Sequence, residues 1–200
     1  MTRAWLLDRL ARYRCATAQE ADLRVRFQAF VAEYEECFER SLKIGHVTGS
    51  AWLVDLERTH VLLTHHQKLD KWLQLGGHAD GDRDVLRVAL REAQEESGLC
   101  SIRAVSDEIF DLDIHRIPAR QNEPEHWHYD VRFFCEADRN EPLRLSSESK
   151  ELRWVGLGDL PRLTSEESIL RMARKMKTWR GHSGGTCLPE SGTGGRASAW

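Results

Sequence analysis

The 200-residue sequence lacks the features that mark membrane-spanning, secreted or nucleic-acid-binding chains. No apolar run approaches the roughly 20 residues that a membrane-spanning helix needs. The N-terminal segment interrupts its apolar residues with Asp8, Arg9 and Arg12, and therefore lacks the apolar core of a signal peptide. A net charge of -3 does not provide the basic surface that extended nucleic-acid binding requires. We therefore expect a cytoplasmic protein whose partners include neither a membrane nor an extended nucleic acid.

Cysteine is also scarce, and its pattern excludes two further classes. The five cysteines are odd in number and no two have the CxxC spacing. A disulfide framework or a cysteine zinc site is therefore not expected. We expect the protein to reside in a reducing compartment. We expect Cys37, Cys100 and Cys135 to be buried thiols.

The composition, 40% hydrophobic and 30% charged, is that of a globular domain with attached segments. Residues 1–44 are predicted to form a helical N-terminal extension, because apolar residues between 18 and 42 recur at three- and four-residue steps. Thr17 and Glu20 have the spacing of a capping box at its start. We expect this extension to pack on the main domain or to form a homodimer interface. Residues 181–200 are rich in Gly and Ser, and we expect a flexible tail.

The main domain, residues 45–180, mixes short strands with helices. Alternating and β-rich runs predict strands over 50–55, 60–64, 71–74, 102–110, 112–116, 127–136 and 151–155. Helices are predicted over 84–97 and 165–179, with a loop over 118–124. Helices before, within and after the strands predict an α/β fold, an α/β/α sandwich with a mixed sheet.

The helix predicted over 84–97 carries a cluster of carboxylates in an unfavourable place. At 100° per residue, Glu92, Glu95 and Glu96 fall within about a 100° sector of one face. The glutamates at 92 and 96 repel each other one turn apart, and the helix dipole disfavours anions in the last turn. Gly98 follows at the expected C′ position, at which glycine commonly ends a helix. A divalent cation would relieve both penalties, and clustered oxygen ligands suit Mg²⁺ or Mn²⁺.

Two adjacent glycines strengthen this interpretation. Gly76 and Gly77 can turn the chain and bring a bare carbonyl oxygen beside the helix as a further ligand. The competing interpretation is a solvated acidic face, in which Arg91 pairs with Glu95 four residues later.

The segment from Gly77 to Leu99 resembles the Nudix box, in which a glycine precedes Arg-Glu-apolar-x-Glu-Glu-x-Gly-apolar at a fixed distance. One position departs from the box, because Arg83 stands where the family has a glutamate. The neighbouring Asp82 and Asp84 could substitute for that carboxylate. The resemblance implies a Nudix-type α/β/α sandwich.

The resemblance also implies a metal-dependent hydrolase that cleaves the pyrophosphate linkage of a nucleoside diphosphate joined to another group. The implied metal ligands for Mg²⁺ or Mn²⁺ are the carbonyl of Gly76 and the carboxylates of Glu92, Glu95 and Glu96. Arg91 would orient a glutamate. The proton of the attacking water would pass to Glu95, Glu148 or Glu151, and the three remain open alternatives.

Candidate substrate-binding residues follow from strand alternation over 127–136 and just before it. His126, His128 and Asp130 share one face, while the intervening apolar residues share the other. The polar face could contact a nucleotide, form an ordinary solvated surface, or hold zinc, although no fourth zinc ligand is evident. His78, directly after the glycines, is a further candidate at the pocket edge. The alternative to an enzyme is a non-catalytic Nudix-like module that binds a nucleotide or a regulator. The departure at Arg83 favours this alternative.

Overall fold

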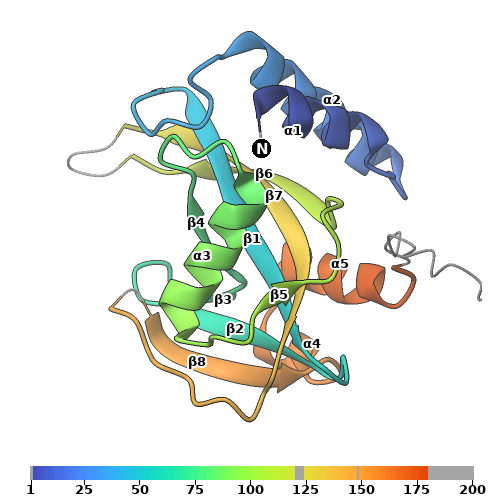
Figure 1. The fold of residues 1–200 in the computed structure, drawn as a ribbon, viewed down its shortest axis with the longest axis vertical. Coiled ribbons are helices and arrows are strands. Elements are labelled where there is room, and N and C mark those ends of the chain that lie inside the picture. Colours follow the sequence, from blue (N-terminus) through green and yellow to red (C-terminus); the bar gives the residue numbers. More distant parts are fainter. Residues whose placement is uncertain (1, 120–123, 148, 180–200) are drawn as a thin grey trace, which may run out of the picture.

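The structure is a computed structural model that describes residues 2–119, 124–147 and 149–179 (Figure 1). The tail predicted over 181–200 and part of the predicted loop over 118–124 lie outside these residues. The helices of the described part are α1 (Arg3–Arg12), α2 (Ala18–Glu33), α3 (Val85–Ser97), α4 (Leu160–Leu163) and α5 (Glu167–Met176). The strands are β1 (Gly45–Asp55), β2 (His60–His66), β3 (Lys71–Leu73), β4 (Leu75–His78), β5 (Arg103–Ala104), β6 (Asp111–Ile117), β7 (His126–Ala137) and β8 (Ser149–Gly156).

The strands form one mixed sheet built around a parallel pair. Strands β1 and β7 run in parallel register along the whole of β1, from Gly45 opposite Trp127 to Asp55 opposite Ala137. Antiparallel strands extend the pair on both sides, with β2 and β4 on β1 and with β5 and β6 on β7. Strand β1 begins five residues before the predicted strand, because its first half alternates polar residues that are nevertheless buried.

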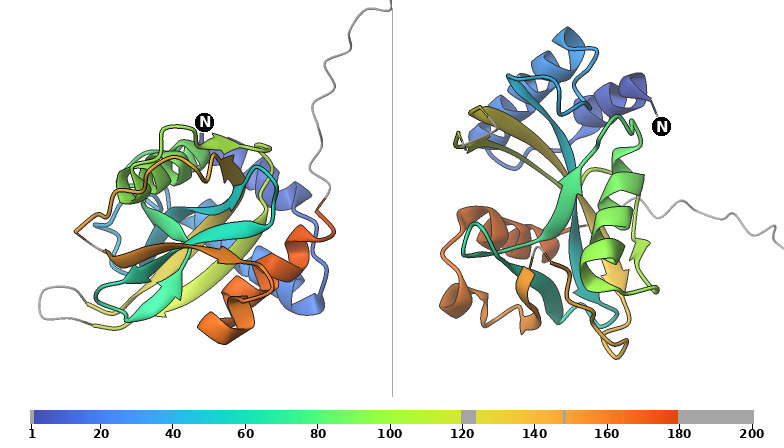
Figure 2. Two further views of the ribbon diagram at one scale, coloured as in Figure 1. Left: turned by 90° about the horizontal axis from the view of Figure 1, so that it is seen from below. Right: turned by 90° about the vertical axis from the view of Figure 1, so that its left-hand side faces the viewer.

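Helices cover both faces of the sheet, and a separate apolar core fills each side. One core joins α1, α2 and α3 to the sheet, and its members include Leu10, Phe30, Val47, Ala89 and Phe133. The other core joins α4 and α5 to the opposite face around a fully buried Trp52. In Figure 2, α3 and α5 lie on opposite sides of the sheet. This arrangement confirms the predicted α/β/α sandwich.

The two N-terminal helices belong to the same core as the sheet. Leu6 and Leu10 of α1 are fully buried, and the ring of Phe30 stacks on Tyr129 of β7 with centroids 3.7 Å apart. The Thr17 hydroxyl accepts a hydrogen bond from the Glu20 amide, as the predicted cap requires. The Glu20 carboxylate accepts from the amide of Ala16, one residue before the cap. The apolar stripe of this segment therefore packs against β7.

Two local expectations are wrong, and one predicted helix is shorter than expected. The strand predicted over 102–110 shrinks to β5, because Asp107 and Glu108 turn aside to bind Arg9 of α1. The helix predicted over 165–179 is confirmed as α5, which is shorter at both ends, and a separate four-residue α4 precedes it. Cys100 is exposed rather than buried, since it lies in the turn after α3, where its amide donates to Glu141.

No helix among the described residues combines the length and the apolar composition that crossing a membrane requires.

We predict that Leu10→Ala destabilises the whole chain by about 2–5 kcal/mol, the usual cost of removing a buried leucine side chain. Leu10 is fully buried in the core shared by α1 and the sheet. Urea unfolding followed by far-UV circular dichroism measures the change. Val25→Ala is the control, because Val25 is 57% exposed and should change stability by less than about 0.5 kcal/mol. Equal stability of Leu10→Ala and the wild type would show that α1 does not belong to the cooperative unit.

Candidate active site

Helix α3 is held at both ends by residues of the motif. The Asp84 carboxylate caps its start by accepting from the Arg87 amide at 3.0 Å. Gly98 ends it in the left-handed conformation, at φ 72°, which only glycine adopts without strain. Val88, Ala89 and Ala93 bury one face of the helix in the core. The adjoining face, which carries the three glutamates, is thereby directed away from the core.

The three glutamates of α3 occupy different environments. The Glu96 carboxylate accepts a hydrogen bond from the Gly76 amide at 2.8 Å, so β4 and the end of α3 are directly joined. The Glu92 side chain is only 20% exposed and lies against Gly77, where any Cβ would overlap its carboxylate. The Glu95 side chain is 64% exposed. The double glycine therefore meets two glutamates at close range and leaves the third in solvent.

Arg91 holds the Glu92 carboxylate in position. Its guanidinium donates to Glu92 at 2.6 Å and to the backbone carbonyl of His78 at 3.0 Å. Its Nε atom lies 3.9 Å from a Glu95 carboxylate oxygen, so the pair between Arg91 and Glu95 that the competing interpretation expects is also present. Burial raises the pKa of Glu92 above its usual value, although the adjacent Arg91 opposes this shift. Arg91 thus contacts both the helix and the segment that follows the double glycine.

Glu92 and Glu96 line a cavity of about 330 Å³ between α3 and the sheet. Gly76 and Gly77 form part of the same wall, and the cationic side chains of Arg40 and Lys68 also border the cavity. Four of the residues expected to bind substrate line it as well, namely His78, His126, His128 and Asp130. One cavity therefore unites carboxylates, cations and imidazoles from segments far apart in the sequence.

The remaining carboxylate candidates lie elsewhere. Glu95 and Glu151 are not among the described residues that line this cavity. Glu151 is about half-exposed on β8, where it accepts two hydrogen bonds from Arg153. Glu148 lies outside the described residues.

The residue that departs from the motif is exposed, and its two acidic neighbours are already engaged. Asp82 forms a two-point ion pair with Arg87, and Asp84 caps α3. Arg83 itself is exposed at the start of α3. The aspartates therefore stabilise the loop and the helix start.

Asp130 reaches the cavity through a network that the sequence did not predict. The carboxylate is 2% exposed and accepts hydrogen bonds from Thr48, Ser50, Gln74 and Arg132. Thr48 and Ser50 belong to β1, which presents polar side chains at every second position just as β7 does. The alternation of polar residues in both strands, which begins at His46 in β1, could have predicted that β1 contributes to this part of the site.

The histidines of the cavity wall are closely grouped. The Nε2 atoms of His126 and His128 lie 3.3 Å apart, and His46 stacks near His126 with ring centroids 4.9 Å apart. Burial, together with neighbouring cationic or imidazole groups, lowers the pKa of His78 to about 4 and that of His128 to about 2. These two imidazoles are therefore neutral at pH 7, so they can accept a hydrogen bond or bind a metal ion.

Comparisons with known proteins agree with this architecture. The NUDIX domain model matches residues 46–176. A bis(5'-nucleosyl)-tetraphosphatase (asymmetrical) of Rattus norvegicus is 27% identical over 54% of this chain and 71% of its own length. Its Mus musculus counterpart is 31% identical over 48% of this chain and 63% of its own length. The crystal structure of a C. elegans Ap4A hydrolase binary complex superposes with a TM-score of 0.53 at 17% identity, covering 66% of this chain and 95% of that one. The match to the family over most of the chain, together with the glutamate-bearing helix and its paired glycines, shows that the chain belongs to the NUDIX family and is a Nudix hydrolase.

Proposed function

We propose that the chain uses Mg²⁺ or Mn²⁺ to hydrolyse the pyrophosphate linkage of a nucleoside diphosphate joined to another group. The observation that carries the proposal is the meeting of Glu92 and Glu96 with Arg40 and Lys68 around one cavity. Carboxylates supply ligands for a divalent cation, and cationic side chains attract the phosphates that such a cation would neutralise. A small-molecule nucleotide is therefore the partner we expect.

The donors around the cavity fit a hard divalent cation. Glu92 and Glu96, one turn apart on α3, are oxygen donors on the same wall as the Gly76 backbone, whose carbonyl is the third proposed ligand. Glu95 is the fourth proposed ligand at the exposed end of this row. A divalent cation held there would neutralise phosphate oxygens and lower the pKa of water.

The chain's own residues supply the remaining requirements. Arg91 holds the Glu92 carboxylate by a direct ion pair. The Glu92 side chain would therefore lose less conformational freedom when it binds a metal ion. Arg40 is bound to Asp80 and is held at the cavity edge, where it would orient a phosphate. His78, His126 and His128 line the same wall and would contact other parts of the nucleotide. Asp130 would position this wall through its bonds to β1.

The choice of substrates to test follows from the relatives. Two of them are named bis(5'-nucleosyl)-tetraphosphatases, so dinucleoside tetraphosphates belong in the screen beside nucleoside diphosphate derivatives. Hydrolysis is measured with Mg²⁺ and with Mn²⁺, and identification of the products locates the cleaved bond. Metal-dependent cleavage of at least one nucleotide supports the proposal. Nucleotide binding without cleavage of any of them would favour a non-catalytic module instead.

We predict that Glu96→Gln lowers kcat at least about 100-fold with Mg²⁺, because stabilisation of phosphate charge by a bound cation supplies several kcal/mol. The amide oxygen of glutamine can still accept from the Gly76 amide, so the fold should persist, which circular dichroism checks. Glu57→Gln is the matched control on an exposed turn. Wild-type turnover and metal affinity in Glu96→Gln would contradict the assignment.

A second pair of variants identifies the general base. We predict that Glu95→Gln lowers kcat by about 10²–10⁴-fold, the usual contribution of a positioned proton acceptor. Glu151→Gln should remain within about threefold of the wild type, because Glu151 is bound to Arg153 on β8. Steady-state rates at saturating substrate distinguish the two. The opposite order of effects would make Glu151 the base.

We predict that Arg83→Glu leaves kcat similar or raises it. Arg83 is exposed and is not among the described residues that line the cavity, so restoring the carboxylate of the family pattern should remove no contact to metal or substrate. The comparison uses initial rates at limiting Mg²⁺, where a gain in metal affinity is visible. A loss of most activity would show that Arg83 itself contacts substrate.

A further inference from the structure

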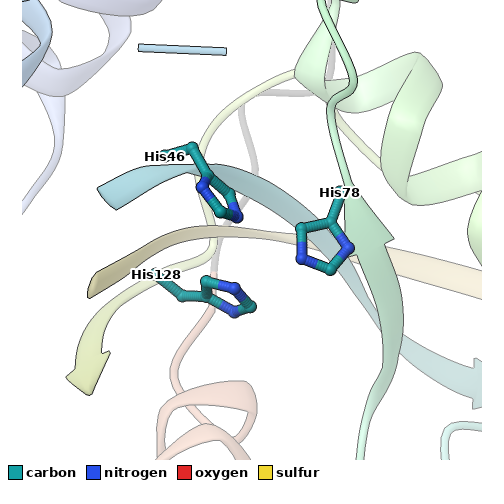
Figure 3. Close-up of side chains that lie close together, drawn as sticks. All are labelled: His46, His78 and His128. Carbon is teal, nitrogen blue, oxygen red and sulfur yellow. The ribbon is translucent and has the colours of Figure 1, made fainter. Parts of the chain in front are cut away.

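Three imidazoles from three strands converge beside the cavity, and two of them, His78 and His128, line it. His46 comes from β1, His78 from β4 and His128 from β7, and their rings turn toward one another (Figure 3). One ring nitrogen from each lies within 4.8 Å of the other two. Histidine is the commonest side-chain ligand of metal ions, so three imidazoles that share such a small volume form a candidate metal site.

We propose that His46, His78 and His128 bind a transition metal ion of the Zn²⁺ class, in a site distinct from the carboxylates of α3. Imidazole nitrogen is a ligand for Zn²⁺, Cu²⁺ or Ni²⁺, whereas Mg²⁺ takes oxygen ligands. The two sites would therefore select different cations from the same solution.

The sheet fixes the relative positions of the three histidines. His46 lies directly opposite His128 in the parallel β1–β7 register. His78 is opposite Thr48 in the antiparallel β1–β4 register, two residues along β1 from His46. The backbones of all three are thus held by strand pairing, and only rotation of the side chains remains free.

The distance that the rings must close is small. Zn–N bonds of about 2.0–2.1 Å in a tetrahedron separate two ligand nitrogens by about 3.4 Å. The three nitrogens lie within 4.8 Å of one another, so each pair needs to approach by at most about 1.4 Å. Rotation about the side-chain torsions achieves this without moving the strands. Metal binding should accordingly rigidify the three rings.

His126 is the candidate for a fourth ligand. Its Nδ1 lies 2.9 Å from the Pro124 carbonyl oxygen, which can only accept, so Nδ1 carries the proton. Nε2 then presents a lone pair, and it lies 3.3 Å from Nε2 of His128. A ring nitrogen held by a backbone carbonyl in this way is the usual support of a metal-binding histidine. Without His126, three ligands leave a coordination position for water or another oxygen donor.

The charges near the cluster permit a cation. Arg40, which borders the same cavity, is paired with Asp80, so its charge is compensated locally. His78 and His128 are neutral at pH 7, which is the form that coordinates metals.

The test is calorimetric titration of the untagged chain with Zn²⁺ in excess Mg²⁺, which occupies oxygen sites but not imidazoles. We expect one equivalent to bind to the wild type. His78→Asn and His128→Asn should each weaken Zn²⁺ binding at least tenfold. The control His65→Asn, outside the cluster on β2, should leave it unchanged. Glu96→Gln should also leave it unchanged, which separates this site from the proposed magnesium site.

Absence of Zn²⁺ binding to the wild type would overturn the proposal, as would equal affinity in the histidine variants or loss only in Glu96→Gln. X-ray absorption of the Zn²⁺-loaded wild type is independent of whether any variant folds. It should detect at least three nitrogen ligands with imidazole scattering at about 2.0–2.1 Å. A first shell of oxygen alone would contradict the assignment. A wild-type chain that hydrolyses nucleotides with Mg²⁺ but binds no Zn²⁺ would overturn only the zinc proposal, so the two proposals can fail separately.

Discussion

The parallel register of β1 and β7 is the constraint on which the rest of the site depends. A shift by one residue would reverse the face on which every side chain of a strand lies. In the observed register, His46 faces His128 and Thr48 faces Asp130. The same strands carry apolar residues toward the cores on their other positions, and burial of those residues fixes the register. The arrangement of the cavity wall is therefore a consequence of packing at a distance from it.

A buried network of ion pairs beneath this wall joins α2 and α5 to the sheet. Arg132, 2% exposed, forms ion pairs with Asp130, Asp111 and Asp113. Asp111 also binds Arg171 and Lys175 of α5, and Lys175 reaches Glu20 of α2. Burial alone would raise the pKa of Asp111, but the surrounding cations lower it below its usual value. Such a network favours one arrangement of its elements, because removing a single partner leaves an uncompensated charge at a cost of about 3–5 kcal/mol.

Local sequence patterns predicted the parts of the fold whose cause is local. The helix at 84–97 and its ends could be inferred because Asp84 and Gly98 act within their own turn. The strand that carries His126, His128 and Asp130 could be inferred from alternation alone. The polar alternation of β1 was visible in the sequence, but it could not show that Asp130, about 80 residues away, accepts hydrogen bonds from Thr48 and Ser50. The short β5 was missed because Arg9, nearly 100 residues earlier, binds the acidic residues that would have continued it.

The contact between Gly77 and Glu92 has a consequence for how this sequence can vary. A methyl group at position 77 would occupy the space of the Glu92 carboxylate, whereas a shorter acid at position 92 would vacate it. The effect of a substitution at either position thus depends on the residue at the other, and the two changes do not add. A substitution at one of the two positions alone should therefore be unfavourable, and a compensating substitution at the other position should reduce its cost.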